Sequence, residues 1–183
     1  MKIFKNEILA LSFILLISSS CQHDLKDETL PPITQTGQNT FGCLINGNVW
    51  INEGMTGSSG GNFWAFVTSN YFKMTAIRRN SNPTTIYQSF GFDIESPIHV
   101  GKYILNKGTQ YAGFEDDITH CPYKTDSISS LQTLEITKYD SINHIIAGTF
   151  NFQAMKKSSV QNTYNCDSTI NITEGRFDLK YEY

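Results

Sequence analysis

Alternation of apolar and polar residues with a period of two is the feature that most constrains how this chain can fold. It runs through residues 133–137, 149–154 and 176–183. Successive side chains of a β-strand point to opposite faces, so each segment predicts a strand with one buried and one solvated face. Beyond Thr40 no 3.6-residue apolar period lasts for ten residues. The sequence therefore predicts an all-β domain.

Turn-forming residues separate these segments. Asn46-Gly47 lies between two apolar runs and predicts a tight hairpin. Residues 140–143 are expected to turn between two strands, and Glu174-Gly175 is expected to join a strand over 169–173 to one over 176–183. About ten strands at this spacing predict an antiparallel β-sandwich, with a closed or partly open β-barrel as the alternative.

One segment lacks the alternation. Residues 63–67 read Phe-Trp-Ala-Phe-Val and are apolar at every position. A strand buried on both faces has this character, so we expect it in the centre of the sheet. A turn at 69–70 then leads into the next strand.

The first twenty residues carry a targeting signal. Two lysines precede an apolar core at 8–17, and three serines at 18–20 precede Cys21. A charged start, a short apolar core and small residues before the cut are typical of a secretory signal. Cys21 directly after small residues resembles a bacterial lipobox, which implies lipidation of Cys21. The alternative is an ordinary cleaved signal with an incidental cysteine.

Residues 21–38 are expected to form a lipidated flexible tether, and 39–183 a single β-domain. The tether begins with an acidic stretch at 22–28 that cannot pack against a core. It resembles the acidic export tag of Bacteroidetes surface lipoproteins. This predicts an outer-membrane lipoprotein facing the cell surface, with a periplasm-facing position as the alternative.

Several strand and turn segments across about residues 30–183 resemble a family of uncharacterised Bacteroidetes lipoproteins, a domain of unknown function. The segments that carry this resemblance are Thr40-Phe41-Gly42, Asn46-Gly47 with Trp50, 101–105, 136–140, 148–152 and 173–178. The resemblance implies an exported, lipid-anchored, all-β protein, and it implies no catalytic residues.

Three cysteines remain once Cys21 is assigned to lipid. Export places them where disulfides persist, and three cysteines allow three pairings. Cys43 lies in an apolar segment and has the character of a small buried hydrophobic residue. Cys121 and Cys166 lie near predicted loops, so we predict a Cys121–Cys166 disulfide; three free thiols are the alternative.

Chemistry-bearing motifs are sparse. Glu115, Asp116 and Asp117 form the one acidic cluster of the domain and are weak candidates for a hard cation such as Ca²⁺, although their spacing fits no EF-hand loop. His120-Cys121 is no base–nucleophile pair, because adjacent strand residues point to opposite faces. We predict no catalytic residues, no metal and no cofactor.

Two kinds of surface residue are candidates for recognition. Trp50 and Tyr111 are proposed as exposed aromatics that could stack on sugar rings. Ser127, Ser141 and Ser168 each follow an aspartate and precede an apolar residue or threonine, which resembles the O-glycosylation acceptor of exported Bacteroidetes proteins. Asp-Ser is also a common turn pair, which is the alternative explanation.

The net charge of the protein limits the classes of partner that it is expected to bind. The formal net charge is -3, with 14 basic and 17 acidic residues. Without a basic excess to neutralise phosphates, no nucleic-acid partner is expected. The sequence therefore favours a non-catalytic surface module that binds a glycan or a protein. The alternatives are an accessory subunit of an envelope complex and, less favoured, a hydrolytic enzyme.

Overall fold

The structure, a computed structural model, describes residues 29–53, 62–80, 86–105, 108–117, 119–125, 132–157 and 165–181. These residues form eleven strands: β1 Thr40–Ile45, β2 Asn48–Ile51, β3 Phe63–Thr68, β4 Tyr71–Asn80, β5 Ile86–Ile94, β6 Gly101–Ile104, β7 Gln110–Asp116, β8 Cys121–Thr125, β9 Gln132–Asp140, β10 Ile145–Lys156 and β11 Thr169–Lys180. Across these seven stretches no helix is long and apolar enough to cross a membrane.

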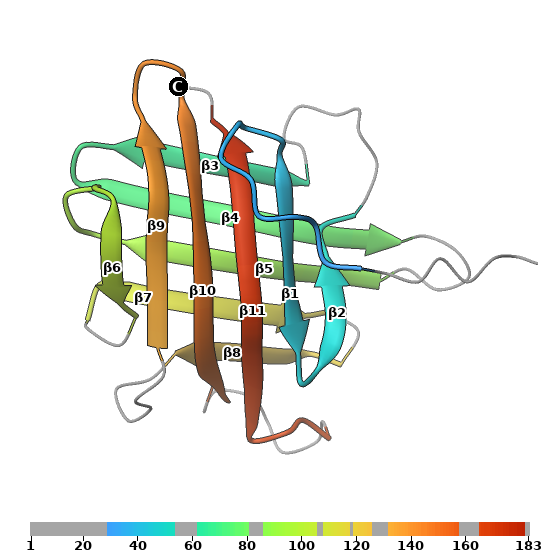
Figure 1. The fold of residues 1–183 in the computed structure, drawn as a ribbon. Helices are drawn as coiled ribbons and strands as arrows, with labels where there is room; N and C mark the ends of the chain where they lie inside the picture. The colour runs from blue at the N-terminus through green and yellow to red at the C-terminus, as the bar shows by residue number, and fades with distance from the viewer. Residues whose placement is uncertain are drawn as a thin grey trace, which may run out of the picture.

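All strands belong to one antiparallel sheet that curls into a half-barrel with two layers (Figure 1). The front layer consists of β2, β1, β11, β10, β9 and β6, and the back layer of β3, β4, β5, β7 and β8, which run crosswise behind it. Strand β10 joins the layers: it pairs with β9 as far as Phe152, and its end, from Ala154 to Lys156, pairs with β8. The predicted all-β antiparallel fold is confirmed, as a partly open form between sandwich and barrel.

The predicted hairpin at Asn46-Gly47 is confirmed. It connects β1 to β2, and Ile45 pairs with Asn48 across it. Asn46 and Gly47 have φ of 48° and 84°. Positive φ at both central residues gives a twist that matches the strands, and asparagine and glycine adopt it at least cost.

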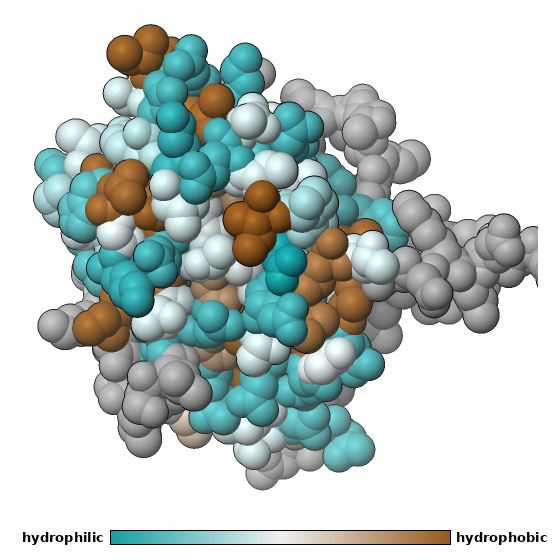
Figure 2. Space-filling view, in the orientation of Figure 1, coloured by the Kyte–Doolittle hydropathy of each residue, from teal (hydrophilic) through white to brown (hydrophobic). Residues whose placement is uncertain are grey.

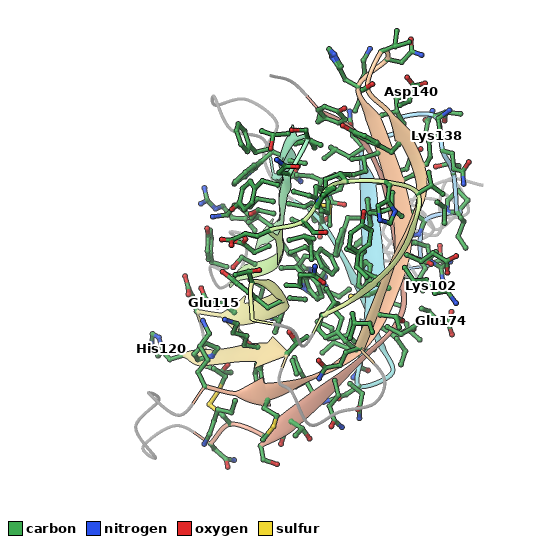
Figure 3. The ribbon with its side chains drawn as sticks, turned by 90° about the vertical axis from the view of Figure 1, so that its left-hand side faces the viewer. Lys102, Glu115, His120, Lys138, Asp140 and Glu174 are labelled. Carbon is green, nitrogen blue, oxygen red and sulfur yellow. A yellow bond between two sulfur atoms is a disulfide. The ribbon has the colours of Figure 1, made fainter. Side chains whose placement is uncertain are left out.

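Aromatic side chains fill the space between the layers (Figure 3). Phe90 and Phe92 of β5 point inward from the back layer, and Phe41, Phe150 and Phe177 meet them from the front layer. Large rings at alternate positions of crossing strands bury the most apolar area per residue, which accounts for a core rich in phenylalanine.

The expected turn at Glu174-Gly175 is wrong. Strand β11 continues through these residues, and a bulge opposite Asn151 takes up Glu174, whose φ is 51°. Gly175 pairs with Phe150, and a Cβ at Gly175 would lie 2.2 Å from the Phe150 ring. The glycine is therefore required by the ring packed against it rather than by a chain reversal.

The predicted central position of residues 63–67 is also wrong. Among the strands that the structure describes, β3 lies at the end of the strand order and pairs only with β4. Its burial alternates, with Phe63 inside while Trp64 and Phe66 are exposed on the outer face. The apolar residues on the outer face of this strand are thus an exposed aromatic pair, and the strand is buried on one face only.

Residues 29–39, which we call the N-terminal strap, cross the outer face of β1 and β11 (Figure 1). Asp178 of β11 is buried and accepts hydrogen bonds from the Thr34 hydroxyl and from the amides of Thr36, Gly37 and Gln38, at 2.7–3.1 Å. The last part of the expected flexible tether is therefore fixed to the folded domain. Elsewhere this face is largely hydrophilic, with small separate apolar patches (Figure 2).

Replacing Asp178 with asparagine is expected to lower the free energy of unfolding at neutral pH by about 1.5–3 kcal/mol, because charge-assisted hydrogen bonds to the strap are lost. Burial alone would raise the pKa of Asp178, but the bonds from Thr34 and the strap amides outweigh it and lower that pKa. The stabilisation is thus complete above the unfolded pKa of about 3.9 and is lost as the pH falls through the lower folded value.

Urea denaturation of the wild type and Asp178→Asn, at neutral pH and near pH 2.5, measures this dependence. The difference between their free energies of unfolding should be smaller near pH 2.5 than at neutral pH. Asp117→Asn, at an exposed carboxylate, is the control and should change stability little at either pH. If the free energies of unfolding of the wild type and Asp178→Asn differed by the same amount at both pH values, the role given to the charge would be contradicted.

Candidate functional site

Two glycines lie side by side on the outer face of the back layer. Gly91 of β5 pairs with Gly113 of β7, between inward-pointing neighbours such as Phe90 and Phe114. Alternation along both strands directs any side chain at these two positions to the outside. The paired glycines therefore leave a stretch of sheet with no side chain above it.

Backbone conformation requires glycine at neither position, and packing leaves room for a side chain at Gly91 but little at Gly113. Their φ values are not among the positive ones of the described residues. A Cβ at Gly91 would have only the Met74 carbonyl oxygen near it, at 3.4 Å, and one at Gly113 only that of Tyr123, at 3.2 Å. Glycine weakens a strand interior, and it is common where a ligand or another backbone approaches closely. Within the part of the chain that the structure describes, no other backbone atom lies within 4 Å of a Cβ built at either glycine.

A groove of about 290 Å³ opens over the pair. The cross-strand register places Lys73, Asp93 and Tyr111 in one row beside it, and Ser89 and Glu115 in the row on the other side. We call this site the glycine groove. Glu115 lies on the side of the molecule opposite Lys102, Lys138 and Glu174 of the front layer (Figure 3), so the groove faces away from that layer.

Asp93 is the centre of the polar groups in the groove. The hydroxyls of Tyr71 and Tyr111 both donate to its Oδ2, each at 3.2 Å. Burial, followed by the charge of Asp93, raises the pKa of both tyrosines, which keeps their hydroxyls protonated as donors. Oδ1 of Asp93 accepts neither of these two bonds and is the oxygen that a ligand hydroxyl can use.

Lysines hold both ends of the groove. The Lys124 ammonium lies 3.6 Å from the centre of the Tyr111 ring, a cation–π contact that fixes the ring plane. Lys157 Nζ lies 3.2 Å from Glu115 Oε1. Positive and negative groups alternate around the groove, so it has no strong net preference for an anion or a cation.

The groove offers one kind of chemistry. Carboxylate and hydroxyl acceptors stand beside ammonium and hydroxyl donors within one small area, above a floor of glycine Cα groups. The amides and carbonyls of that floor are committed to the sheet ladders. Such a surface suits a ligand that presents several donors and acceptors around an apolar ring face.

The two aromatic candidates have different environments. Tyr111 is half-buried and lines the glycine groove, and its contact with a ligand stays a prediction. The expectation that Trp50 is exposed is wrong, because only 3% of its surface is accessible. Its ring packs edge-on against Phe41 in the core, and its indole N–H donates to Gln88 Oε1 at 2.9 Å.

Trp50 does line a second cavity, of about 400 Å³, between the layers beside the disulfide. Two polar groups at its wall are bonded within the protein: the indole N–H to Gln88, and the Asn46 side chain to the amide of Asn171.

The predicted Cys121–Cys166 disulfide is confirmed, with a Cα–Cα distance of 5.8 Å. It links β8 of the back layer to the segment that precedes β11 of the front layer. Cys43 is a free, buried thiol whose pKa is raised by burial, so it remains protonated and unreactive.

The acidic residues Glu115, Asp116 and Asp117 line one pocket together with His120, but they are not arranged as a metal site. Glu115 points outward to Lys157, whereas the neighbouring Asp116 lines the cavity between the layers, because adjacent strand residues alternate. Asp117 follows β7 and is exposed. Among the described residues no three His, Cys, Asp or Glu side chains form a group that could hold a metal ion.

The remaining candidates lie on turns or outside the described residues. Ser141 is exposed in the turn between β9 and β10, where hydrogen bonds from Asn143 and Ile142 lower the pKa of Asp140 to about 2. Ser168 is exposed directly before β11. Cys21 and Ser127 lie outside the described residues. Both described serines are accessible, and their modification stays a prediction.

No family model, no curated protein and no solved structure matches this chain.

The glycine groove was not anticipated from the sequence, except for Tyr111. A signal was present: both glycines interrupt a strand pattern, in Phe90-Gly91-Phe92 and Ala112-Gly113-Phe114. That these two interruptions face each other depends on the register of β5 against β7, which no local pattern specifies.

Proposed function

We propose that this protein is a non-catalytic surface module that binds a saccharide in the glycine groove. The observation that carries the proposal is the Gly91–Gly113 pair. It forms a floor without side chains beside Asp93, although backbone conformation requires glycine at neither position and packing leaves room for a side chain at Gly91.

The polar groups of the groove favour a hydroxyl-rich ligand. A sugar hydroxyl can donate to Asp93 Oδ1 and accept from Lys73, and a second hydroxyl can reach Ser89 or Glu115 in the opposite row. The apolar face of a sugar ring fits a floor of Cα groups. A strongly charged ligand would meet like charge on at least one side, because lysines and carboxylates alternate around the groove.

An extended peptide fits less well. Peptides that bind sheets usually add a strand at an open edge, where backbone groups are free. At the glycine groove the backbone groups of β4, β5 and β7 already pair with one another. A peptide lying there would leave its own amides and carbonyls without main-chain partners.

Gly91→Val tests the site. Its side chain would project into the groove, and a β-branched residue favours a strand, so the variant is expected to unfold at the same temperature as the wild type or higher. We expect it to lose saccharide binding, measured by calorimetry against soluble cello-, xylo-, manno- and malto-oligosaccharides. Thr133→Val, at an exposed position of β9 in the front layer, is the matched control and should bind normally.

Asp93→Asn supplies a second measurement at the same site. Losing a charged acceptor is worth about 1.5–3 kcal/mol, which corresponds to roughly tenfold to hundredfold weaker binding. If the wild type bound none of the four saccharide classes, or if Gly91→Val bound as well as Thr133→Val, the proposal would be wrong.

A lipid on Cys21 would present this site to the outside. The strap crosses the outer face of the front layer, whereas the groove opens on the outer face of the back layer. A tether that continues from the strap to a membrane therefore leaves the groove accessible. Cys21→Ser should then abolish the partition of the protein into membranes; unchanged partition would refute the anchor while leaving the binding proposal intact.

A further inference from the structure

We infer that the glycine groove is one end of a longer site that crosses the back layer to Trp64 and takes a linear oligosaccharide. This rests on the saccharide ligand proposed above and adds its length, its direction and a second recognition residue. The inference rests on one continuous row of outward-facing strand positions that links the groove to the exposed Trp64.

The register of four strand pairs defines this row. Trp64 of β3 pairs with Thr75 of β4, Thr75 with Gly91 of β5, Gly91 with Gly113 of β7, and Gly113 with Lys124 of β8. All five positions point outward, and among the described residues of this row only the small side chain of Thr75 lies between Trp64 and the glycine floor. The middle of the row therefore has small side chains or none, whereas its two ends carry the larger side chains of Trp64 and Lys124.

The spacing of the strands sets the length of ligand that the row can hold. Neighbouring strands lie about 4.8 Å apart, so Trp64 is about 10 Å from Gly91 and about 14 Å from Gly113. A single sugar ring that sits on the glycine floor cannot also stack on Trp64. A chain of sugars lying across the strands can do both.

Trp64 has the properties of a stacking platform. It is 38% exposed, although tryptophan is among the residues that gain most from burial. The indole of an edge strand on the outer face offers a flat apolar surface to a sugar ring at little cost in conformational entropy. Unlike Trp50, which packs in the core, it keeps part of its surface open to solvent.

Phe66, the other exposed aromatic of β3, has a different position. Its ring centre lies 6.1 Å from that of Tyr71, the tyrosine that donates to Asp93. Phe66 occupies the row of Lys73 and Asp93 and supports the polar group from the side. It is therefore a positioning residue, whereas Trp64 is expected to touch the ligand.

Binding as a function of chain length tests the inference. Calorimetry with oligosaccharides of one to six units, from the four classes named above, should show that the wild type gains affinity with length until the chain spans the row. Trp64→Ala should bind the long chains about tenfold more weakly than the wild type does. Its affinity for the shortest chains that bind should be unchanged. Trp64→Tyr should restore most of the gain, because it keeps a flat ring.

Ile104→Ala is the matched control, since Ile104 is an exposed apolar residue of β6 in the other layer. It should bind every chain length as the wild type does. Circular dichroism and thermal unfolding of Trp64→Ala establish that the domain remains folded. Loss of binding to long chains alone would support the extended site.

The other outcomes overturn the inference in distinguishable ways. If Gly91→Val abolishes binding while Trp64→Ala weakens no chain length, or weakens all lengths equally, the groove remains a saccharide site and its extension to Trp64 is wrong. If the wild type binds none of these saccharides, the proposed function fails and this inference fails with it.

Discussion

Phe90→Ala is expected to lower the free energy of unfolding by about 3–5 kcal/mol, because it leaves a large cavity at the centre of the core. Phe90 is 1% exposed. Its ring centre lies 5.2–6.1 Å from those of six aromatic neighbours from both layers: Phe41, Trp50, Phe92, Phe114, Phe150 and Phe152. Rings this numerous and rigid cannot collapse far into the vacated space.

Thermal unfolding measures this effect, and the midpoint should fall by roughly 6–20 °C for a domain of this size. Phe66→Ala removes the same atoms from a side chain that is 50% exposed on the outer face. It should cost far less, because part of that ring remains in water. Equal shifts for the two variants would contradict the position of Phe90 at the centre of the core.

Removing the disulfide with Cys121→Ser and Cys166→Ser together is expected to cost about 4 kcal/mol by the loop-entropy argument, for cysteines 45 residues apart. The crosslink restricts the unfolded chain over a segment that includes β9 and β10. In the folded protein it holds β8 against the segment before β11, close to the place where β10 passes from one layer to the other.

A reductant provides the matched experiment. Dithiothreitol should lower the unfolding midpoint of the wild type and of Cys43→Ala, since both keep the Cys121–Cys166 bond. It should leave the double serine variant unchanged, because Cys43, its one remaining cysteine in the β-domain, is unpaired. A wild-type midpoint that did not respond to reductant under conditions that reduce the bond would refute the assigned stabilisation.

Local patterns predicted the features that depend on neighbouring residues. The hairpin at Asn46-Gly47 follows from two residues that tolerate positive φ between apolar runs. The strands β9 and β10 follow from their alternation. These features need little information from distant parts of the chain, so a sequence pattern is sufficient.

The incorrect predictions concern features that depend on distant parts of the chain. Gly175 was interpreted as a turn because the ring of Phe150, which excludes a side chain there, comes from another strand. Strand β3 was placed centrally because apolar composition does not distinguish a doubly buried strand from an edge strand with an exposed Trp64. Trp50 was expected outside, although the rings that surround it are brought together only by the curled sheet.

The sequence by itself determined that the domain is all-β and where most of its strands and turns lie, since the period of two and the turn residues act over a few positions. Only the tertiary structure decided that Gly91 faces Gly113, that Asp93 lies between Tyr71 and Tyr111, and that Trp64 shares their outer surface. The physical reason is register: a shift of one residue between strands would send each of these groups to the opposite face.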